Sequence, residues 1–284
     1  MQKIIVVGAS GSVGWAVLES LLKRGAEAVA AARNIDELQD FQKRGLECRH
    51  LDITDSYTWA EAMNGVDKIF LIRPSRLFNV RRDMEPFLEF LSDQNLTQAV
   101  FLSIQGADKD PQLPHSKIEQ FIIRRWIPYT FLRPSLFMQN LIEIHRNEIK
   151  SDNILFIPSY SKKASYIDIR DLAEAAAVTL TEDGHLSKTY ELTGAESTSY
   201  ENIAKELSNA LGRQIMYKNP SIPEFLWVKR NEEHPLSYVI AALAYNELAK
   251  AGKTEASVST LERLIGRKPT TLSEFIIEHK LEWE

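Results

Sequence analysis

The sequence has almost none of the residues that build disulfide frameworks or cysteine-rich metal sites. Cys48 is the single cysteine among 284 residues, so no internal disulfide can form. The apolar run that follows Met1-Gln2-Lys3 is too short for a signal peptide or a membrane span. A formal charge of −5 gives no basic surface of the kind that nucleic-acid binders present. We therefore expect a cytoplasmic protein that binds no metal, no membrane and no nucleic acid directly.

The composition is that of a globular protein with one or two domains. Hydrophobic residues make up 44% of the chain and charged residues 26%, which favours a packed core over long disordered segments. A length of 284 residues is enough for one large α/β domain and a smaller lobe.

Short apolar runs alternate with helical patterns through residues 1–150. After the first run, Val13, Val17 and Leu21 recur at helical spacing. The predicted strands are 4–7, 28–32, 48–51, 68–72, 99–103 and 129–132. This alternation predicts repeated βαβ units and a parallel sheet, so we expect a Rossmann-type doubly wound α/β domain over residues 1–150.

The pattern changes in residues 151–284. Further strands are predicted at 154–157, 165–169 and 189–192, and helices at 172–180, 199–211 and 238–250, before a final helix with Leu272, Phe275 and Ile276. We expect a smaller α+β lobe that completes a substrate cleft, with some segments returning to the main sheet.

A glycine-rich turn joins the first predicted strand to the first predicted helix. Its sequence is Gly-Ala-Ser-Gly-Ser-Val-Gly over residues 8–14. A helix N-terminus at such a turn points backbone N–H groups at a pyrophosphate, which a Cβ on the approaching residues would obstruct. The strand–turn–helix context predicts a dinucleotide site, and the G-x-x-G-x-x-G spacing is typical of short-chain dehydrogenase/reductases. The residues expected to hold the cofactor here are Gly8, Ser10, Gly11, Ser12, Val13 and Gly14.

Arg33 follows the second strand, where an NAD-specific protein would carry Asp or Glu. A guanidinium can bind the 2′-phosphate of NADP(H), so we expect NADP(H) to be preferred, with NAD(H) as the alternative. Asp52 and Ile53 follow the third strand and are expected to line the adenine pocket. The competing interpretations are a solvated arginine and a helix-capping aspartate.

The ends of later strands meet the same edge of a doubly wound sheet. Ile72, Arg73 and Pro74 follow the fourth strand, and Ser103 follows the fifth; all four are expected to border the cofactor. Gln105 is expected to face the substrate. Four arginines make the region after the fourth strand basic, which suits an anionic ligand or a solvated face: Arg73, Arg76, Arg81 and Arg82.

Further motifs lie outside the glycine turn: HSKIE at 115–119, IPYTFLRPS at 127–135, FMQN at 137–140, YIDIRDLA at 166–173 and YELTG at 190–194. Together with the turn, the sequence resembles the NmrA-like family of atypical short-chain dehydrogenase/reductases almost from end to end. The resemblance implies a Rossmann fold that binds NAD(P)H. The family includes reductases of quinones, azo dyes and triphenylmethane dyes, and also cofactor sensors that regulate transcription.

The resemblance also implies that the catalytic dyad of short-chain dehydrogenases is broken. In that dyad, Tyr-x-x-x-Lys, the tyrosine relays a proton to or from the substrate oxygen. If Lys117 occupies the lysine position, Leu113 occupies the tyrosine position. This loss disfavours alcohol oxidation and sugar-nucleotide epimerisation. A quinone or an extended dye needs less help, because it is electrophilic once it contacts the nicotinamide.

Two residues are candidates for catalysis. Lys117 is expected to hold the nicotinamide ribose or to stabilise a developing anion, and His115 to donate a proton. Both are also compatible with solvent-facing positions at the start of a helix. The residues expected at the substrate lip are Phe137, Met138 and Asn140, with Tyr160, Trp227 and Tyr238 closing the cleft or packing in the lobe.

The leading hypothesis is an NADPH-dependent oxidoreductase that transfers hydride to a flat quinone-like or dye-like acceptor. The first alternative is a non-catalytic NAD(P)-binding redox sensor of NmrA type that engages a protein partner. The second is a reductase of a specific metabolite that uses an unfamiliar acid such as His115. The apolar stretch 238–248 is compatible with a homodimer interface or with a core helix.

Overall fold

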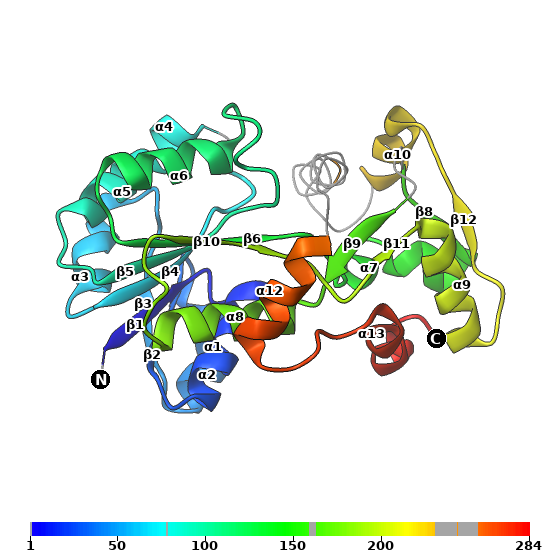
Figure 1. Cartoon of the computed structure of the whole chain (residues 1–284), viewed down its shortest axis with the longest axis horizontal. Helices are drawn as coiled ribbons and strands as arrows, with labels where there is room; N and C mark the ends of the chain where they lie inside the picture. The colour runs from blue at the N-terminus through cyan, green and yellow to red at the C-terminus, as the bar shows by residue number, and fades with distance from the viewer. Residues whose placement is uncertain (1, 78, 159–162, 231–242, 244–254) are drawn as a thin grey trace. The chain divides into compact units, whose positions relative to one another are not determined.

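The computed structural model describes residues 2–77, 79–158, 163–230, 243 and 255–284 (Figure 1). The chain forms two compact units. The first contains Met1–Arg133 and Ile169–Glu191, and the second contains Pro134–Asp168 and Leu192–Glu284. The sequence analysis placed a single boundary at residue 150. The structure divides the chain differently, because it leaves the first unit after Arg133 and returns to it for 23 residues.

A seven-stranded sheet runs through the first unit. Its strands are β1 (Lys3–Val7), β2 (Glu27–Ala32), β3 (Glu47–His50), β4 (Lys68–Ile72), β5 (Gln98–Leu102), β6 (Tyr129–Pro134) and β10 (Lys188–Leu192). The strand order is β10-β6-β5-β4-β1-β2-β3, and β1 to β6 pair with their neighbours in parallel. The order reverses between β1 and β4, as in a doubly wound Rossmann sheet. The predicted fold class is confirmed.

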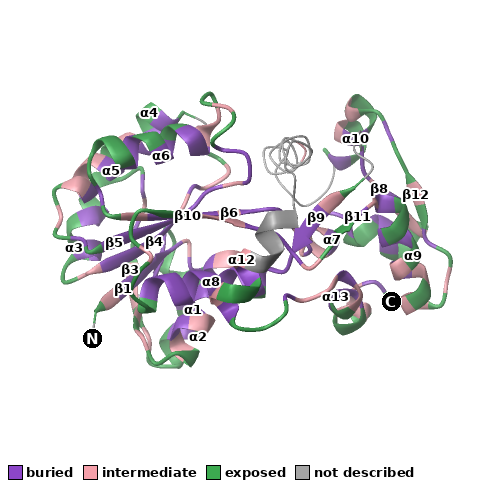
Figure 2. Cartoon of the chain, in the orientation of Figure 1, coloured by how far each residue is buried: buried purple, intermediate pink, exposed green. Residues whose placement is uncertain are grey.

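Both faces of this sheet are buried. Ile5 and Val6 are neighbours whose side chains point to opposite faces of β1, and neither is exposed to solvent. The same pattern holds in β2, where Val29 to Ala32 are all buried. Figure 2 shows the buried strands between helices whose outer surfaces are exposed. Strands covered on two sides require continuous apolar runs, which explains why the sequence predicted them so well.

Helices cover the two faces. They are α1 (Ser12–Lys23), α2 (Gln39–Lys43), α3 (Trp59–Met63), α4 (Val80–Asp83), α5 (Glu85–Ser92), α6 (Pro114–Arg124) and α8 (Ile169–Thr181). Single turns of 3₁₀-helix occupy Ile35–Leu38 and Ser56–Thr58. Helices α1 and α8 pack together on one face of the sheet, and α5 and α6 lie on the other (Figure 1). Three consecutive buried alanines in α8, Ala175 to Ala177, allow this close contact.

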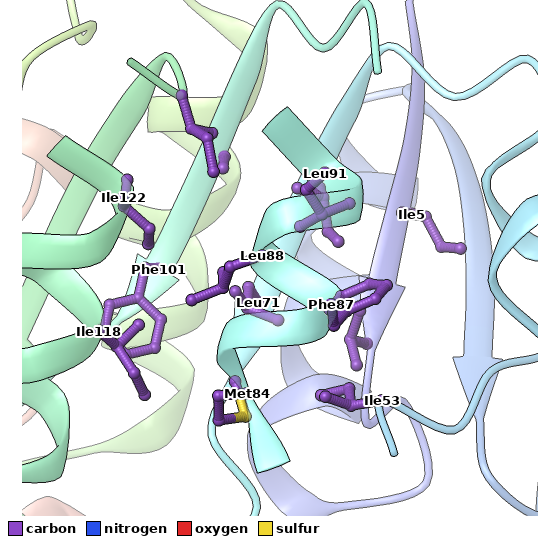
Figure 3. Close-up of a cluster of buried hydrophobic side chains, with 14 of the residues drawn as sticks. Ile5, Ile53, Leu71, Met84, Phe87, Leu88, Leu91, Phe101, Ile118 and Ile122 are labelled. Atoms are coloured by element: carbon purple, nitrogen blue, oxygen red, sulfur yellow. The ribbon is translucent and has the colours of Figure 1, made fainter. Parts of the chain in front are cut away.

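The core on the α5 and α6 face places α6 against the sheet. Phe87 and Leu88 of α5 and Ile118 of α6 meet Leu71 of β4 and Phe101 of β5 in one buried cluster (Figure 3). Each fully buried side chain of this size contributes about 1.5 to 3 kcal/mol relative to exposure. The first turn of α6 is therefore held rigidly at the end of β5.

A charged network ties α6 to the strand at the edge of the unit. Arg133 of β6 donates two hydrogen bonds to the carboxylate of Glu119 in α6, at 3.0 and 2.7 Å. It donates a third, of 3.1 Å, to Glu191 of β10. Burial disfavours the guanidinium charge, but the two carboxylates outweigh it and raise the pKa of Arg133. The last residue before the chain enters the second unit is thus firmly fixed.

The second unit has two small sheets and its own core. One sheet has the strand order β11-β9-β7, and the other pairs β12 with β8. The strands are β7 (Leu136–Phe137), β8 (Ile154–Phe156), β9 (Ala164–Ile167), β11 (Ser197–Thr198) and β12 (Met216–Lys218). The helices are α7 (Asn140–Glu143), α9 (Tyr200–Leu211), α10 (Ile222–Lys229), α12 (Glu255–Ile265) and α13 (Leu272–Glu278). A π-helix spans Glu148–Asp152 and a 3₁₀ turn spans Lys280–Glu282.

The core of the second unit is aromatic and aliphatic. Trp283 and Phe275 are fully buried in it, together with Ile203 and Leu207 of α9. The predicted final helix is confirmed as α13, whose N-terminus has a capping box between Thr271 and Glu274. The helix expected over residues 238–250 lies outside the described residues except for Leu243. No helix in the described part of the chain combines the length and hydropathy needed to cross a membrane.

The junction of β1 and α1 allows no side chain at Gly14. A Cβ at this position would lie 2.2 Å from the carbonyl oxygen of Gly8 and 2.9 Å from the Cα of Ala9. These obstacles are backbone atoms, which cannot swing aside. At Gly11, by contrast, a Cβ would lie 3.5 Å from the same oxygen, an ordinary contact.

We expect Gly14→Ala to lower the free energy of unfolding by about 2 to 3 kcal/mol, because α1 must move away from β1. Urea denaturation of the two alanine variants measures the effect. Gly11→Ala is the matched control. Its backbone, with φ −86°, suits alanine, but alanine is a poorer N-cap than glycine; because the two effects oppose each other, the free energy of unfolding should change by less than about 1 kcal/mol. Equal losses in the two variants would contradict the packing argument.

Candidate functional site

The glycine turn lies at the carboxyl edge of the sheet, where β1 ends. Gly8 has φ +73°, a left-handed conformation that glycine adopts without strain. The turn is fixed to β2, because Ala9 N–H donates to Ala31 O at 2.9 Å. Gly11 is the N-cap of α1 and has no side chain to cover the first helical turn. This is the geometry in which a helix N-terminus binds a phosphate group.

The predicted residues of this turn divide by exposure. Gly14 is buried, Gly8 and Val13 are half-buried, and Ser10, Gly11 and Ser12 are exposed. The exposed residues are those at the approach to the helix N-terminus, where a ligand would contact them. Ile72, at the end of β4, lies beside the turn, because its Cδ1 is 3.9 Å from the position of a Cβ on Gly8.

Two arginines gather around Asp52 beside this turn. Arg76 Nη2 lies 3.8 Å from Asp52 Oδ1, and Arg33 is close enough to act on the same carboxylate. Burial alone would raise the pKa of Asp52. Two hydrogen bonds from Thr54 and the charges of Arg76 and Arg33 outweigh burial and lower it. Both arginines are exposed, so their positive charges face solvent at the ends of β2 and β4.

The sequence analysis selected Arg33 for the cofactor and left Arg76 in a general basic region. The strand order explains why Arg76 also lies at this site. Strands β2 and β4 both flank β1, so their ends approach the same glycine turn. Asp52 holds its own loop, accepting bonds of 2.8 and 2.7 Å from Thr54. Ile53 is buried in the core cluster (Figure 3), which leaves little of its side chain for an adenine ring. The cofactor roles of Asp52 and Ile53 stay predictions.

The segment after β4 carries a buried arginine. Arg73 Nη1 donates to the carbonyl oxygens of Leu77 and Pro74, at 2.8 and 3.2 Å, and so closes the loop on itself. Its Nε donates to Nε2 of His115 over 3.4 Å. The imidazole also stacks on Phe101, with ring centroids 6.0 Å apart.

His115 occupies an environment that disfavours its protonated form. It is 5% exposed. Burial, and secondly the positive charge of Arg73, lower the pKa of His115 well below its usual value. The imidazole accepts the hydrogen bond from Arg73 at Nε2, which requires that nitrogen to be unprotonated. These contacts argue against an imidazolium at neutral pH and so weigh against the predicted role as proton donor.

Lys117 projects from the first turn of α6 and is exposed. Its backbone N–H donates to Leu113 O at 3.1 Å, so the two residues are one helical turn apart, as the tyrosine and lysine of a dehydrogenase dyad would be. Leu113 is the N-cap of α6 and offers no acidic group. The role of Lys117 stays a prediction.

Two polar side-chain atoms near the end of β5 are buried without a hydrogen-bond partner in the described protein. They are Ser103 Oγ and Gln105 Oε1. Leaving such an atom unpaired costs about 1 to 3 kcal/mol. Their positions, just beyond the carboxyl end of a central strand, are where a doubly wound fold binds its ligand. Together with the glycine turn, they fit a bound dinucleotide that supplies the missing hydrogen bonds.

The residues predicted for the substrate fall in different environments. Gln105 belongs to the first unit, and Phe137, Met138 and Asn140 belong to the second. Phe137 and Asn140 line a small pocket of the second unit, with a cavity volume of about 20 Å³. Met138 is instead buried in the core of that unit, because neighbouring residues near β7 point to opposite faces.

The structure describes one of the three aromatic residues expected to close the cleft. Trp227 of α10 is exposed, and the guanidinium of Arg230 lies over its ring, 3.3 Å from the centroid. Tyr160 and Tyr238 lie outside the described residues. Among the described residues, no group of three or more His, Cys, Asp or Glu is arranged to hold a metal ion.

A family model described as NAD(P)H-binding matches residues 8–183, which include the glycine turn and the ends of β2, β4 and β5. The chain belongs to this NAD(P)H-binding family. It is 26% identical over 284 residues to an NAD(P)H azoreductase of Xenophilus azovorans, covering 97% of both chains.

Solved structures give the same result. The NADPH complex of the Escherichia coli quinone oxidoreductase QOR2 superposes with a TM-score of 0.85 at 27% identity, covering 98% of this chain and 99% of that one. NmrA, a negative transcriptional regulator solved with NADP, has the same fold, with a TM-score of 0.77 at 14% identity and coverage of 99% and 96%. The expected NAD(P)H-binding fold is confirmed, and the likeness to NmrA is one of fold.

We expect the stability of the protein to fall as pH drops below about 6.5, the pKa of an unfolded histidine. The folded pKa of His115 is depressed, so in this window the unfolded state binds more protons and folding loses free energy on acidification. The slope contributed by His115 is at most about 1.4 kcal/mol per pH unit.

Urea denaturation across pH 5 to 8 measures this slope. His115→Phe, which keeps a ring against Phe101, should remove the contribution of His115. A variant at the exposed His50, His50→Gln, is the control and should retain it. If His115→Phe keeps the full slope, another group causes it.

Proposed function

We propose that the protein is an NADPH-dependent reductase that transfers a hydride to a flat quinone-like or dye-like acceptor. The observation that carries the proposal is the convergence of Arg33, Arg76 and the glycine turn at one edge of the sheet. The similarity to an azoreductase and to a quinone oxidoreductase, each over nearly the whole chain, supports the acceptor class.

Different residues would bind different parts of the cofactor. The first turn of α1 would bind the pyrophosphate, and Arg33 and Arg76 the 2′-phosphate, as charge-assisted hydrogen-bond donors. Ser103 and Gln105 would receive hydrogen bonds from, or give them to, the nicotinamide half. The bound cofactor supplies a hydride from its nicotinamide ring. These contacts hold the reacting ring at one place and in one orientation, which is the main contribution a protein makes to such a transfer.

The chemistry must proceed without the acid of a typical dehydrogenase. Leu113 stands where that tyrosine would be, and the buried His115 is held neutral by its surroundings. A quinone or a cationic dye accepts hydride without prior protonation. With a cationic dye the hydride gives a neutral product directly. With a quinone it gives an oxyanion, which the ammonium of Lys117, exposed at the first turn of α6, would stabilise before water completes the protonation.

The residues at the start of α6 also fit a second function, a non-catalytic NAD(P) sensor. A sensor needs the glycine turn and the arginines but no acid, so Leu113 and a neutral His115 suit it equally well. In that case the second unit would contact a protein partner.

Steady-state oxidation of NADPH and NADH, with and without a panel of quinones and dyes, separates the two functions. We expect oxidation of NADPH that depends on the acceptor and exceeds that of NADH. Tight binding of NADPH without turnover of any acceptor would replace the reductase by the sensor.

We expect Arg33→Ala and Arg76→Ala each to weaken NADPH binding by about 5- to 100-fold, the range for one lost charged hydrogen bond, while NADH binding changes less than twofold. Calorimetric titration of both cofactors measures this selectivity. Arg125→Ala is the control, because Arg125 pairs with Glu89 at the far end of α6. Equal losses for NADPH and NADH would overturn the assignment of the 2′-phosphate site.

A further inference from the structure

A buried arginine closes the turn that follows β4. The backbone N–H of Leu77 donates to Pro74 O at 3.0 Å, so residues 74–77 form a β-turn with Ser75 and Arg76 at its centre. The guanidinium of Arg73 donates from Nη1 to the carbonyl oxygens at both ends of this turn, those of Pro74 and Leu77. The turn is therefore closed by a backbone hydrogen bond and, across the same residues, by a side chain.

The turn is also anchored to the interior of the first unit. Nε of Arg73 donates to Nε2 of His115, and the ring of His115 stacks on Phe101 of β5, a residue of the core cluster (Figure 3). At the other end of the turn, Leu77 is buried in the same cluster. Arg73 itself is only 8% exposed. The backbone on both sides of Arg76 is consequently fixed.

The choice of an arginine for this position needs a reason. Burying a charged group costs free energy unless its N–H groups find acceptors. Arginine carries its N–H donors in a planar fork of fixed geometry, so one guanidinium can bond two carbonyl oxygens and an imidazole at once. Arg73 makes these three contacts, and all of them hold the turn that carries Arg76.

Arg76 is the part of the turn that a ligand can reach. Its side chain is 46% exposed, and its Nη2 lies 3.8 Å from Oδ1 of Asp52. A long side chain loses rotamer freedom when it binds a phosphate group, and a mobile backbone adds to that loss. A fixed turn and a nearby carboxylate reduce the loss in advance. The arrangement therefore favours strong binding by Arg76 of an anion at the edge of the sheet.

We propose that Arg73 is a positioning residue for cofactor selectivity, which fixes the turn that presents Arg76 to the 2′-phosphate of NADPH and does not itself contact that phosphate. The inference rests on the 2′-phosphate site of the proposed function. It goes beyond that site by assigning part of the preference for NADPH over NADH to a buried residue. It also gives His115 a role that a neutral ring can fill, as the acceptor that orients Arg73.

Calorimetric titration of NADPH and NADH into Arg73→Lys tests this role. Lysine keeps the positive charge but lacks the planar fork that bonds both ends of the turn. We expect the affinity for NADPH to fall about three- to tenfold, because Arg76 must be ordered on binding, and the affinity for NADH to fall by less than about twofold. The readout is the ratio of the two affinities, since general damage to the fold lowers both.

A double-mutant cycle with Arg76→Ala determines whether Arg73 acts through Arg76. If it does, Arg73→Lys should change the affinity ratio by less than about twofold once residue 76 is alanine. If Arg73 binds the 2′-phosphate directly, the two losses should multiply in the double variant, which would overturn the positioning role.

Arg213→Lys is the matched control. Arg213 also donates to backbone carbonyl oxygens, but these belong to Ile149, Lys150 and Trp283 of the second unit. Its replacement removes the same kind of hydrogen bond and should leave both cofactor affinities unchanged.

Pro74→Gly covers the case in which Arg73→Lys does not fold. It loosens the same turn and leaves the carbonyl acceptors of Arg73 in place. We expect the ratio of NADPH to NADH affinity to fall by about two- to fivefold in this variant. An unchanged ratio would show that the rigidity of the turn does not matter, and the proposal would fail.

The outcomes also separate this proposal from the proposed function. If the NADH affinity of Arg73→Lys falls as far as its NADPH affinity, Arg73 has no selective role. A ratio that is unchanged in Arg73→Lys and lowered in Arg76→Ala removes the positioning role and leaves the 2′-phosphate site. A ratio unchanged in Arg76→Ala removes both. A selective loss in Arg73→Lys, in a protein that reduces no quinone or dye, supports the positioning role and removes the reductase.

Discussion

The close approach of α1 to the Gly8 carbonyl is the constraint on which the cofactor edge depends. Because Gly14 has no Cβ, the helix can begin directly above the end of β1 and bring its first N–H groups to the turn. The same contact fixes the face of α1 that packs on α8. A side chain at Gly14 would therefore disturb the glycine turn, helix α1 and the packing of α8 on α1 together.

Electrostatics at this edge are organised around one carboxylate. Asp52 is held by Thr54 and draws Arg33 and Arg76 towards it from the ends of β2 and β4. The negative charge is only partly exposed, whereas both guanidinium groups face solvent. The net result is a small positive region beside a helix N-terminus, which is suited to a ligand with several phosphates.

Much of the fold and of the cofactor edge could be predicted from the sequence, and each feature that was missed has a physical reason. The strands and the glycine turn depend on neighbouring residues, so local patterns were sufficient. Arg76 was missed because its meeting with Asp52 depends on the strand order. The burial of His115 was visible in principle, since Ile118 and Ile122 lie three and seven residues further along the same helical face. The hydrogen bond between Arg73 and His115 joins residues 42 apart, which no spacing reveals.

The return of residues 169–191 to the first unit has a consequence for how the protein is made. Helix α8 and strand β10 complete that unit only after residues 134–168 have been synthesised. A nascent chain that has reached residue 150 would expose the alternate face of the sheet, including Val6 and Ala30, to chaperones and to aggregation. Both units should consequently be kept together in expression, truncation or domain exchange. A fragment cut at residue 150 should not be a stable protein.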